Sequence, residues 1–503
     1  MGALRRVLAP SPWWRDYRWA MALTITTARS APAAVKLVGV GVFSDLDRPD
    51  SLPSDVLDSR GFNGGLGKTM IIDTDKGLRA VIGLGKTEDF DASALRKAGA
   101  SFARAARRHK TVATTLLADA VGAIDGIDQG ACAEALAEGL QLGHYGFEKY
   151  KGKKKTARND LTKVTVAGST SAAVKNGLAT GPAIAEGQML ARDLVNEPGG
   201  TLTPPEMARR VQKMAKGAGL QCKVMDLAAI KKAKLGGLLG VNRGSTHHPR
   251  FVELTYSPPK PTGTIAFVGK GITFDAGGLS IKSGKGMMTM KSDMGGAAAV
   301  IGAMSALKAV GVKARVRAYL PMTDNMLGGD ATRPGDVLKI RNGKTIEVLN
   351  TDAEGRLILA DALSLASEAK PDAIIDLATL TGASMAALGP QIAGLMSNDD
   401  GFARSVIDAS EAAGERLWRL PLPDDYRKMI DSPIADMKNI GGPYGGAITA
   451  GLLLQEFVAE DIPWVHLDIA GPAFTEKPDM ETRKGGTGFG VRTLVALARN
   501  FTK

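Results

Sequence analysis

Two short segments carry most of the chemistry in this sequence and constrain what the chain can fold into. Residues 268–293 (VGKGITFDAGGLSIKSGKGMMTMKSD) follow the apolar run 264–268, and residues 350–357 (NTDAEGRL) follow the apolar run 345–349. Such β-branched runs predict buried strands of an α/β sheet. Polar residues just past the carboxyl ends of such strands lie where open α/β sheets hold their ligands. We therefore expect a functional site there.

The two segments supply four carboxylates, Asp275, Asp293, Asp352 and Glu354. Among their cationic side chains, Lys270, Lys282 and Arg356 are the candidates for a role in the site. Four carboxylates that converge in a partly buried site repel each other unless a multivalent cation gathers them. Carboxylate oxygens are hard ligands for Mg²⁺, Mn²⁺ or Zn²⁺, and paired metal ions typically share bridging carboxylates. The alternative is that the acids are dispersed over the surface or cap local structure.

Charged residues alternate with uncharged ones in the second segment, and this spacing also supports a metal site. Asp352, Glu354 and Arg356 occupy every second position. If the backbone is still extended there, the period of two points all three side chains to one side. The sequence then predicts two acids and a guanidinium facing the same site.

These residues also carry a resemblance to a known family. The blocks VGKGITFD-GG, SIK, MKSDMGGAAAV and NTDAEGRL resemble signature blocks of the leucyl aminopeptidases (cytosol aminopeptidases, peptidase family M17). The resemblance continues through IDLATLTGA (375–383), DMKNIGGPYGGAITAGLLL (436–454) and HLDIAG (466–471), and thus covers the chain from about residue 185 onward. It implies a metal-dependent aminopeptidase that releases N-terminal Leu and other apolar residues from peptides.

The resemblance also implies which residues bind each metal ion. Asp275 and Glu354 would bridge two divalent ions, Mn²⁺ or Zn²⁺, while Lys270 and Asp293 complete one shell and Asp352 the other. Lysine is an unusual ligand because it must bind as a neutral amine, although a nearby dication can displace its proton. The alternative for Lys270 is a salt bridge to the carboxylates.

Two cations resemble the catalytic pair of the family. Lys282 would stabilise the oxyanion that forms when water attacks the peptide carbonyl. Arg356 would hold a bicarbonate ion that accepts the proton of that water. The resemblance requires no histidine, and the five histidines of this chain form no HExxH spacing.

Substrate selection is implied by the same family pattern. A free α-amine would bind one metal ion and hydrogen-bond Asp293, and Lys282 would also contact the substrate. The apolar P1 pocket would be lined by Met290, Thr379, Gly382, Ala470 and Ala473, for which ordinary core packing is the alternative. Ala276 stands where many members have Ser or Thr, so a hydrogen bond beside Asp275 is expected to be missing.

The pattern along the chain predicts a two-domain α/β protein. We expect a disordered extension over residues 1–20, a small N-terminal α/β domain over 21–170 and a connecting helix over 171–195, broken at Gly181-Pro182. Residues 196–503 should form the larger catalytic domain, with a mixed central sheet flanked by helices. In the first domain, strands are expected at 38–43, 79–84, 111–117 and 163–167.

Bulk properties place the chain among globular proteins of the cytoplasm. Cys132 and Cys222 lie far apart and offer no disulfide framework, and no apolar run reaches the length of a membrane span. The resemblance implies a homohexamer, a dimer of trimers. A net charge of +12 and the lysines at 151, 153, 154 and 155 leave a rival interpretation open, a DNA-binding architectural role; a basic surface that aids solubility is the alternative.

Overall fold

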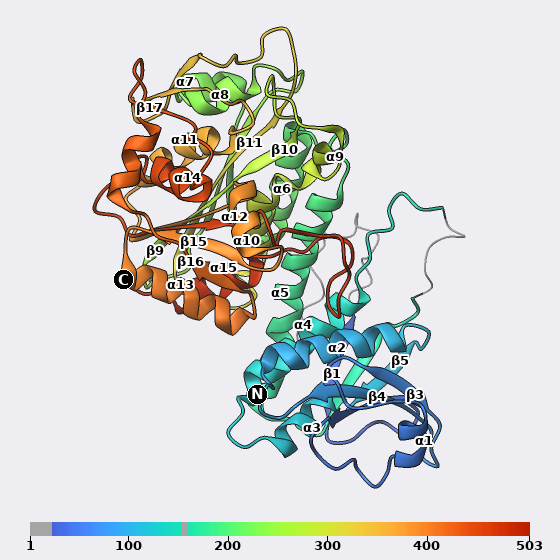
Figure 1. Ribbon diagram of the computed structural model, residues 1–503. Coiled ribbons are helices and arrows are strands. Elements are labelled where there is room, and N and C mark those ends of the chain that lie inside the picture. The colour runs from blue at the N-terminus through green and yellow to red at the C-terminus, as the bar shows by residue number, and fades with distance from the viewer. Residues whose placement is uncertain (1–22, 153–158) are drawn as a thin grey trace. The chain divides into compact units, whose positions relative to one another are not determined.

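The computed structural model describes residues 23–152 and 159–503, which form two compact units (Figure 1). The first unit extends to Glu186 and takes in Lys477–Arg483, and the second comprises Gly187–Glu476 and Lys484–Lys503. The extension predicted over residues 1–20 lies outside the described residues. Within them, no helix is both long enough and apolar enough to span a membrane.

The first unit is an α/β domain built on one sheet. Its strand order is β1-β6-β5-β2-β4-β3, with only the edge pair β3–β4 antiparallel among the described residues. Leu37, Phe102 and Val164 lie in its core. The elements are β1 (Thr24–Ala28), β2 (Leu37–Phe43), α1 (Ser54–Ser59), β3 (Thr69–Ile72), β4 (Leu78–Gly85), α2 (Ala92–Ala106), β5 (Thr111–Thr114), α3 (Leu116–Ala123), α4 (Gln129–His144), β6 (Lys163–Ala167) and the start of α5 (Ala172–Asn196).

Two expectations for this part of the chain were wrong in detail. The strand expected at 111–117 ends at Thr114, because the Thr115 carbonyl starts helix α3 by accepting from Asp119 N. Helix α5 is not broken at Gly181-Pro182 but continues through Pro182. Gly181 packs so closely on α4 that an added Cβ would lie 2.4 Å from the carbonyl oxygen of Glu134, so tertiary packing holds the helix where its local sequence disfavours it.

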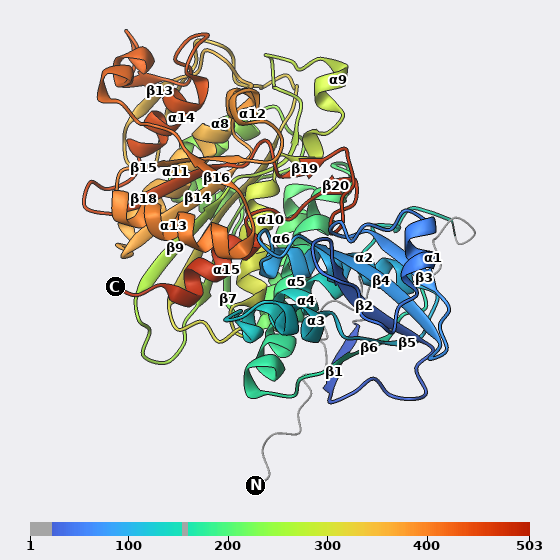
Figure 2. The ribbon, with the colours of Figure 1, turned by 60° about the horizontal axis from the view of Figure 1, so that its bottom comes forward.

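The second unit is the larger α/β domain (Figure 2). Its early elements are α6 (Pro204–Ala218), β7 (Gln221–Met225), α7 (Leu227–Lys232), α8 (Gly236–Asn242), β8 (Arg250–Tyr256), β9 (Thr264–Gly269), β10 (Gly271–Asp275), α9 (Gly284–Met287), η3 (Met290–Ser292), α10 (Gly295–Ala306) and β11 (Arg315–Asn325). The later ones are β12 (Val337–Lys339), β13 (Thr345–Glu347), α11 (Gly355–Glu368), β14 (Ala373–Ala378), α12 (Gly382–Leu388), β15 (Ala393–Ser397), α13 (Asp400–Ala413), β16 (Leu417–Arg419), η4 (Asp424–Ile430), β17 (Met437–Lys438), α14 (Gly446–Gln455), β18 (Trp464–Asp468), β19 (Phe474–Thr475), β20 (Gly485–Gly486) and α15 (Val491–Asn500).

The central sheet of this unit is mixed, as predicted. Its order is β16-β15-β18-β14-β9-β11-β8-β7, with β10 also paired to β11. Strands β18, β14, β9 and β11 run parallel, whereas β15, β8 and β7 provide the antiparallel pairs. Helices α11 and α14 cover one face, and α10, α13 and α15 cover the other (Figure 1). Since β18, β14 and β9 are parallel and adjacent, their carboxyl ends meet at one edge of the sheet.

Candidate metal centre

The first site segment leaves the sheet at a break between two strands. Lys270 lies between β9 and β10, where its N–H donates to Leu377 O at 3.0 Å and its carbonyl accepts from Ala297 N at 2.8 Å. The backbone therefore stays anchored while the side chain turns into the site. Asp275 ends β10 and lies opposite Asn325 at the end of β11.

Asp293 is placed by the turn before helix α10. It follows η3 directly, and α10 begins two residues later at Gly295. A Cβ on Gly296 would lie 1.9 Å from Leu377 O, so only glycine lets the start of this helix lie against β14. That approach brings Asp293 to the carboxyl end of the central strands.

The segment NTDAEGRL adopts a different conformation from the one expected. Its preceding strand, β13, belongs to a small sheet with β12 and β17 and not to the central sheet. The segment is not extended either, because residues 351–352 form a turn and Glu354 is the N-cap of α11, with φ −80° and ψ −33°. Alternation therefore does not align Asp352, Glu354 and Arg356; a turn into a helix separates them.

The four acids nevertheless converge from three separate stretches of chain. Asp275, Asp293 and Glu354 each offer a carboxylate oxygen, and these oxygens all lie within 4.8 Å of one another. All three residues are at most 5 % exposed. Asp352 is joined to the group through Lys282, whose Nζ lies 2.5 Å from Asp352 Oδ1 and 2.9 Å from Asp275 Oδ2.

The ammonium group of Lys270 compensates the negative charges of the other two carboxylates, Asp293 and Glu354. Its Nζ lies 2.8 Å from both carboxylate oxygens of Asp293 and 2.8 Å from Glu354 Oε1. Of the two interpretations given for Lys270, these ion pairs correspond to the salt bridge. Two ammonium groups thus each join two carboxylates, in a site where repulsion would otherwise be severe.

Burial and mutual repulsion shift the acid–base properties of the cluster. Burial raises the pKa values of Asp293, Asp352 and Glu354, and repulsion by the charge of Asp275 raises all three further. Burial opposes the charge on Lys270, but attraction to Asp293, Glu354 and Asp275 raises its pKa. Strongly perturbed groups that share one cluster are typical of functional sites.

The donor set fits divalent cations. Across the described parts of the chain, Oε2 of buried Glu354 accepts no hydrogen bond. A buried carboxylate oxygen without a donor is costly, and a cation would satisfy it. Oxygen ligands from three or four carboxylates are those that Mn²⁺ and Zn²⁺ accept in proteins. The carboxylates predicted as ligands therefore fit divalent ions of the kind that the resemblance implied.

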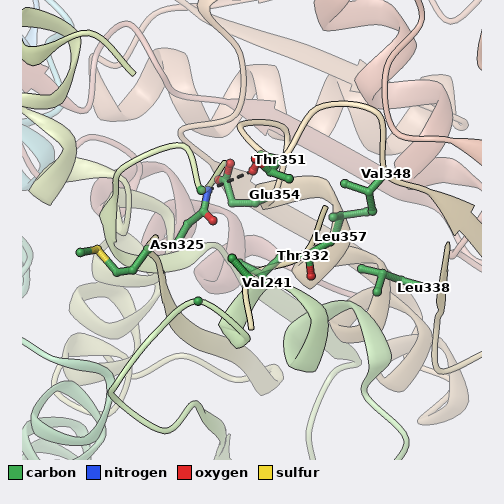
Figure 3. Close-up of a pocket in the computed structure, with 12 residues that line it drawn as sticks. Val241, Asn325, Thr332, Leu338, Val348, Thr351, Glu354 and Leu357 are labelled. Atoms are coloured by element: carbon green, nitrogen blue, oxygen red, sulfur yellow. Dashed lines mark hydrogen bonds between the residues drawn. The ribbon is translucent and has the colours of Figure 1, made fainter. Parts of the chain in front are cut away.

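Asn325 supports Asp275 and was not predicted as a site residue. Its Nδ2 donates to Asp275 Oδ1 at 2.8 Å and to Thr351 O at 3.0 Å, so one amide links the two site segments. Figure 3 shows Asn325, Thr351 and Glu354 together at the edge of a cavity with Val241, Leu338 and Leu357 in its apolar wall. Gly277 N also donates to Asp275 Oδ1 at 2.8 Å, so this carboxylate keeps two hydrogen bonds beside Ala276.

Arg356 lies in the first turn of α11 and is buried. Its Nη1 donates to Asn439 O at 2.7 Å, and its Nε has no hydrogen-bond partner within the described residues. Burial lowers the pKa of Arg356 to about 10, against the attraction of Glu354 and Asp468. The guanidinium therefore keeps its charge at neutral pH and has donor capacity left for an anion.

The predicted P1 residues come from several loops around the cluster. Thr379 follows β14, its Oγ1 donates to Asp293 Oδ1 at 2.8 Å, and its methyl group and that of Ala473 both lie beside Gly295. Ala470 follows β18, Gly382 is the first residue of α12, and Met290 begins η3. The structure thus places Thr379 and Ala473 beside the same glycine and the other three residues on or next to α12, β18 and η3.

Fold and site together define a class, an α/β protein whose buried carboxylates form a candidate metal site at the carboxyl edge of a mixed sheet. Residues 189–495 match the cytosol aminopeptidase family, catalytic domain, and residues 34–154 match its N-terminal domain. The chain therefore belongs to the cytosol aminopeptidase family, and it is a metal-dependent aminopeptidase.

Individual relatives extend over most of the chain. A "Probable cytosol aminopeptidase" of Streptomyces coelicolor is 43% identical, covering 95% of this chain and 98% of that protein, and one of Aquifex aeolicus is 44% identical over 87% of each. Among solved structures, the bottromycin maturation enzyme BotP in complex with Mn is 40% identical, with a TM-score of 0.85 over 93% of this chain and 99% of that one. A mutant of tomato leucine aminopeptidase is 33% identical, with a TM-score of 0.85 over 95% and 97%.

Proposed function

We propose that this enzyme removes N-terminal residues, preferably Leu and other apolar ones, from peptides with the help of two divalent ions, Mn²⁺ or Zn²⁺. The observation that carries the proposal is the convergence of Asp275, Asp293 and Glu354 within 4.8 Å, with Lys282 and Asp352 beside them. Asp275 and Glu354 would bridge the two ions, with Lys270 and Asp293 on one and Asp352 on the other. The Mn bound to BotP supports the choice of manganese.

Divalent ions held there would supply a Lewis acid for the scissile carbonyl and a lowered pKa for a coordinated water. Lys282 is 18 % exposed in its side chain, so it can reach both the carboxylates and a bound peptide. Its ammonium group would stabilise the negative charge that develops on the carbonyl oxygen in the transition state. Asp293 would accept a hydrogen bond from the free α-amine, a group that an internal peptide bond lacks.

Arg356 is proposed to hold a bicarbonate ion beside the reacting water. Its buried guanidinium, with Nε free of hydrogen bonds in the described structure, supports an anion at this position. Withdrawing bicarbonate should slow the native enzyme severalfold but leave Arg356→Ala unchanged. Equal sensitivity of the two proteins would contradict this role.

Metal removal tests the proposal directly. The enzyme is stripped with a chelator, Mn²⁺ or Zn²⁺ is restored, and cleavage of Leu-p-nitroanilide is followed. Turnover should disappear with the metal and return with it, and Glu354→Ala should abolish turnover while circular dichroism shows an intact fold. Metal-independent cleavage, or full activity of Glu354→Ala, would refute the assignment.

Assembly and location remain part of the proposal. The resemblance supports a homohexamer arranged as a dimer of trimers, and the names of the relatives support a cytosolic enzyme. Light scattering coupled to gel filtration would check the oligomeric state, and a monomeric mass under native conditions would contradict the hexamer.

A DNA-binding role rests on charge alone. Three of the lysines that suggest it, 153–155, lie outside the described residues, and Lys151 pairs with Glu148 at 3.5 Å. A mobility-shift assay at low and moderate salt decides the question, since binding by phosphate neutralisation weakens steeply with salt. No shift at either salt concentration would leave the basic surface as an aid to solubility.

A further inference from the structure

Asp468 joins two loops at the carboxyl edge of the central sheet. It ends β18, and its side chain is fully buried. Its Oδ1 accepts from the N–H groups of Leu380, Thr381 and Ala470 at 3.2, 3.4 and 3.2 Å, and its Oδ2 accepts from Thr381 Oγ1 at 2.6 Å. One carboxylate therefore holds the loop after β14 and the loop after β18 at the same time.

The loop after β14 continues into the metal centre. Thr379 precedes the two residues that Asp468 binds, and its Oγ1 donates to Asp293 Oδ1 at 2.8 Å. The carbonyl of the same residue accepts from Lys270 Nζ at 2.9 Å. The position of this loop therefore sets where two proposed metal ligands are held.

The loop after β18 reaches the proposed P1 pocket. Asp468 holds Ala470 N, and Ala473 N donates to Ile469 O at 3.0 Å, so the turn between them is closed. The methyl groups of Ala473 and Thr379 both lie beside Gly295, where an added Cβ would lie 3.2 and 3.3 Å from them. Both loops therefore contribute to the same wall.

We propose that Asp468 is a positioning residue that couples the metal centre to the P1 pocket. It acts through Thr379, which orients Asp293 and Lys270, and through Ala470, which belongs to the loop that supplies Ala473 to the same wall. A charged acceptor makes hydrogen bonds about twice as strong as a neutral one, so a carboxylate holds the four donors better than an amide can. The proposal rests on the proposed function, because it concerns the same metal ions and the same substrate side chain.

The substitution Asp468→Asn tests this role. Loss of a direct partner of a metal ligand typically costs about 10- to 100-fold in metal affinity. Because Asp468 acts one contact further out, Mn²⁺ affinity should fall by about tenfold, the low end of that range, as measured by equilibrium dialysis in the absence of substrate. The preference for Leu- over Phe-p-nitroanilide, taken as a ratio of kcat/KM, should also change severalfold, because the pocket wall loosens. Unchanged affinity together with an unchanged ratio would overturn the proposal.

Asp376 provides a matched control on the neighbouring strand. It is fully buried on β14 and binds Trp464 Nε1 at 2.8 Å and His466 Nδ1 at 2.6 Å, both on β18. Asp376→Asn should lower thermal stability without moving Mn²⁺ affinity or the Leu/Phe ratio. If Asp376→Asn shifts both readouts as much as Asp468→Asn, then Asp468 is only structural and the proposal fails.

A second pair of variants keeps the test open if Asp468→Asn does not fold. Thr381→Val removes the hydroxyl that donates to Asp468, whereas Thr381→Ser retains it. Thr381→Val should weaken Mn²⁺ binding and shift the Leu/Phe ratio, and Thr381→Ser should restore both; equal behaviour of the two would overturn the proposal. Native protein that binds no Mn²⁺ would instead overturn the proposed function, so the two failures are distinguishable.

Discussion

The ammonium nitrogen of Lys270 lies 2.8 Å from Glu354 Oε1, and both side chains are almost completely buried. Lys282 makes the equivalent contact with Asp275 and Asp352. The four carboxylates are thus compensated in pairs by two lysines. Since removing one partner of a buried pair leaves an uncompensated charge, each lysine should matter for stability as well as for chemistry.

Lys270→Met should destabilise the metal-free enzyme by about 3 kcal/mol, because Asp293 and Glu354 lose their buried cation. The loss should be larger at pH 8 than at pH 5, since protonation of the carboxyls relieves their repulsion. Urea unfolding of chelator-treated protein measures it. Lys291→Met is the control, because the Nζ of this half-buried lysine donates to a backbone carbonyl, that of Asn196. Equal effects of the two substitutions would contradict the pairing.

Gly355→Ala should disturb the same lysine without touching a charge. A Cβ at position 355 would lie 2.6 Å from both Cε and Nζ of Lys270, closer than real atoms approach. Overpacking of this kind costs about 1–3 kcal/mol, and it should also weaken Mn²⁺ binding in dialysis. Gly401→Ala is the control, because Gly401 also lies in a helix and an added Cβ there would lie 3.4 Å from its nearest neighbour, Asp399 Oδ1. This substitution should cost no stability. A stable Gly355→Ala enzyme with native metal affinity would show that Lys270 can move freely.

Lys282→Met should lower kcat by about 10²–10³, the usual cost of losing one group that stabilises an oxyanion. KM should change much less, because the interaction strengthens mainly in the transition state. Steady-state kinetics with Leu-p-nitroanilide and saturating Mn²⁺ separate the two constants. Lys285→Met, an exposed position in the short helix α9 just after that loop, should keep the native rate. A rise in KM alone would assign Lys282 to substrate binding only.

The sequence was sufficient to predict the central strand that leads into the site. The run 264–268 forms part of β9, because a short β-branched run is consistent with a buried strand. The convergence of Asp275, Asp293 and Glu354 was implied by the family resemblance, because only Asp275 ends a strand of the central sheet. Local patterning was least reliable where packing decided the outcome, as at Pro182 and along NTDAEGRL.

The supporting residues could not be predicted because their partners are distant in sequence. Asn325 lies 50 residues from Asp275, and Asp468 lies 87 residues from Thr381. Neither position has a local pattern that distinguishes it from an ordinary strand end. The one available signal was position, since both residues end strands at the edge of the sheet where the ligands gather.

Glu186 predicts a pH dependence that is separate from the metal centre. Burial raises the pKa of this half-buried carboxyl on α5 to about 7, against an ordinary value of 4.5. Between pH 4.5 and 7 the folded state keeps a proton that the unfolded state releases, so this group makes stability fall as pH rises through that window.

Glu186→Gln should therefore be more stable than the native enzyme by about 1–3 kcal/mol at pH 8 and nearly equal to it at pH 4.5. Thermal unfolding at the two pH values measures the difference, with exposed Glu411→Gln as the control. A gain of the same size at both pH values would mean that the benefit is not linked to the proton.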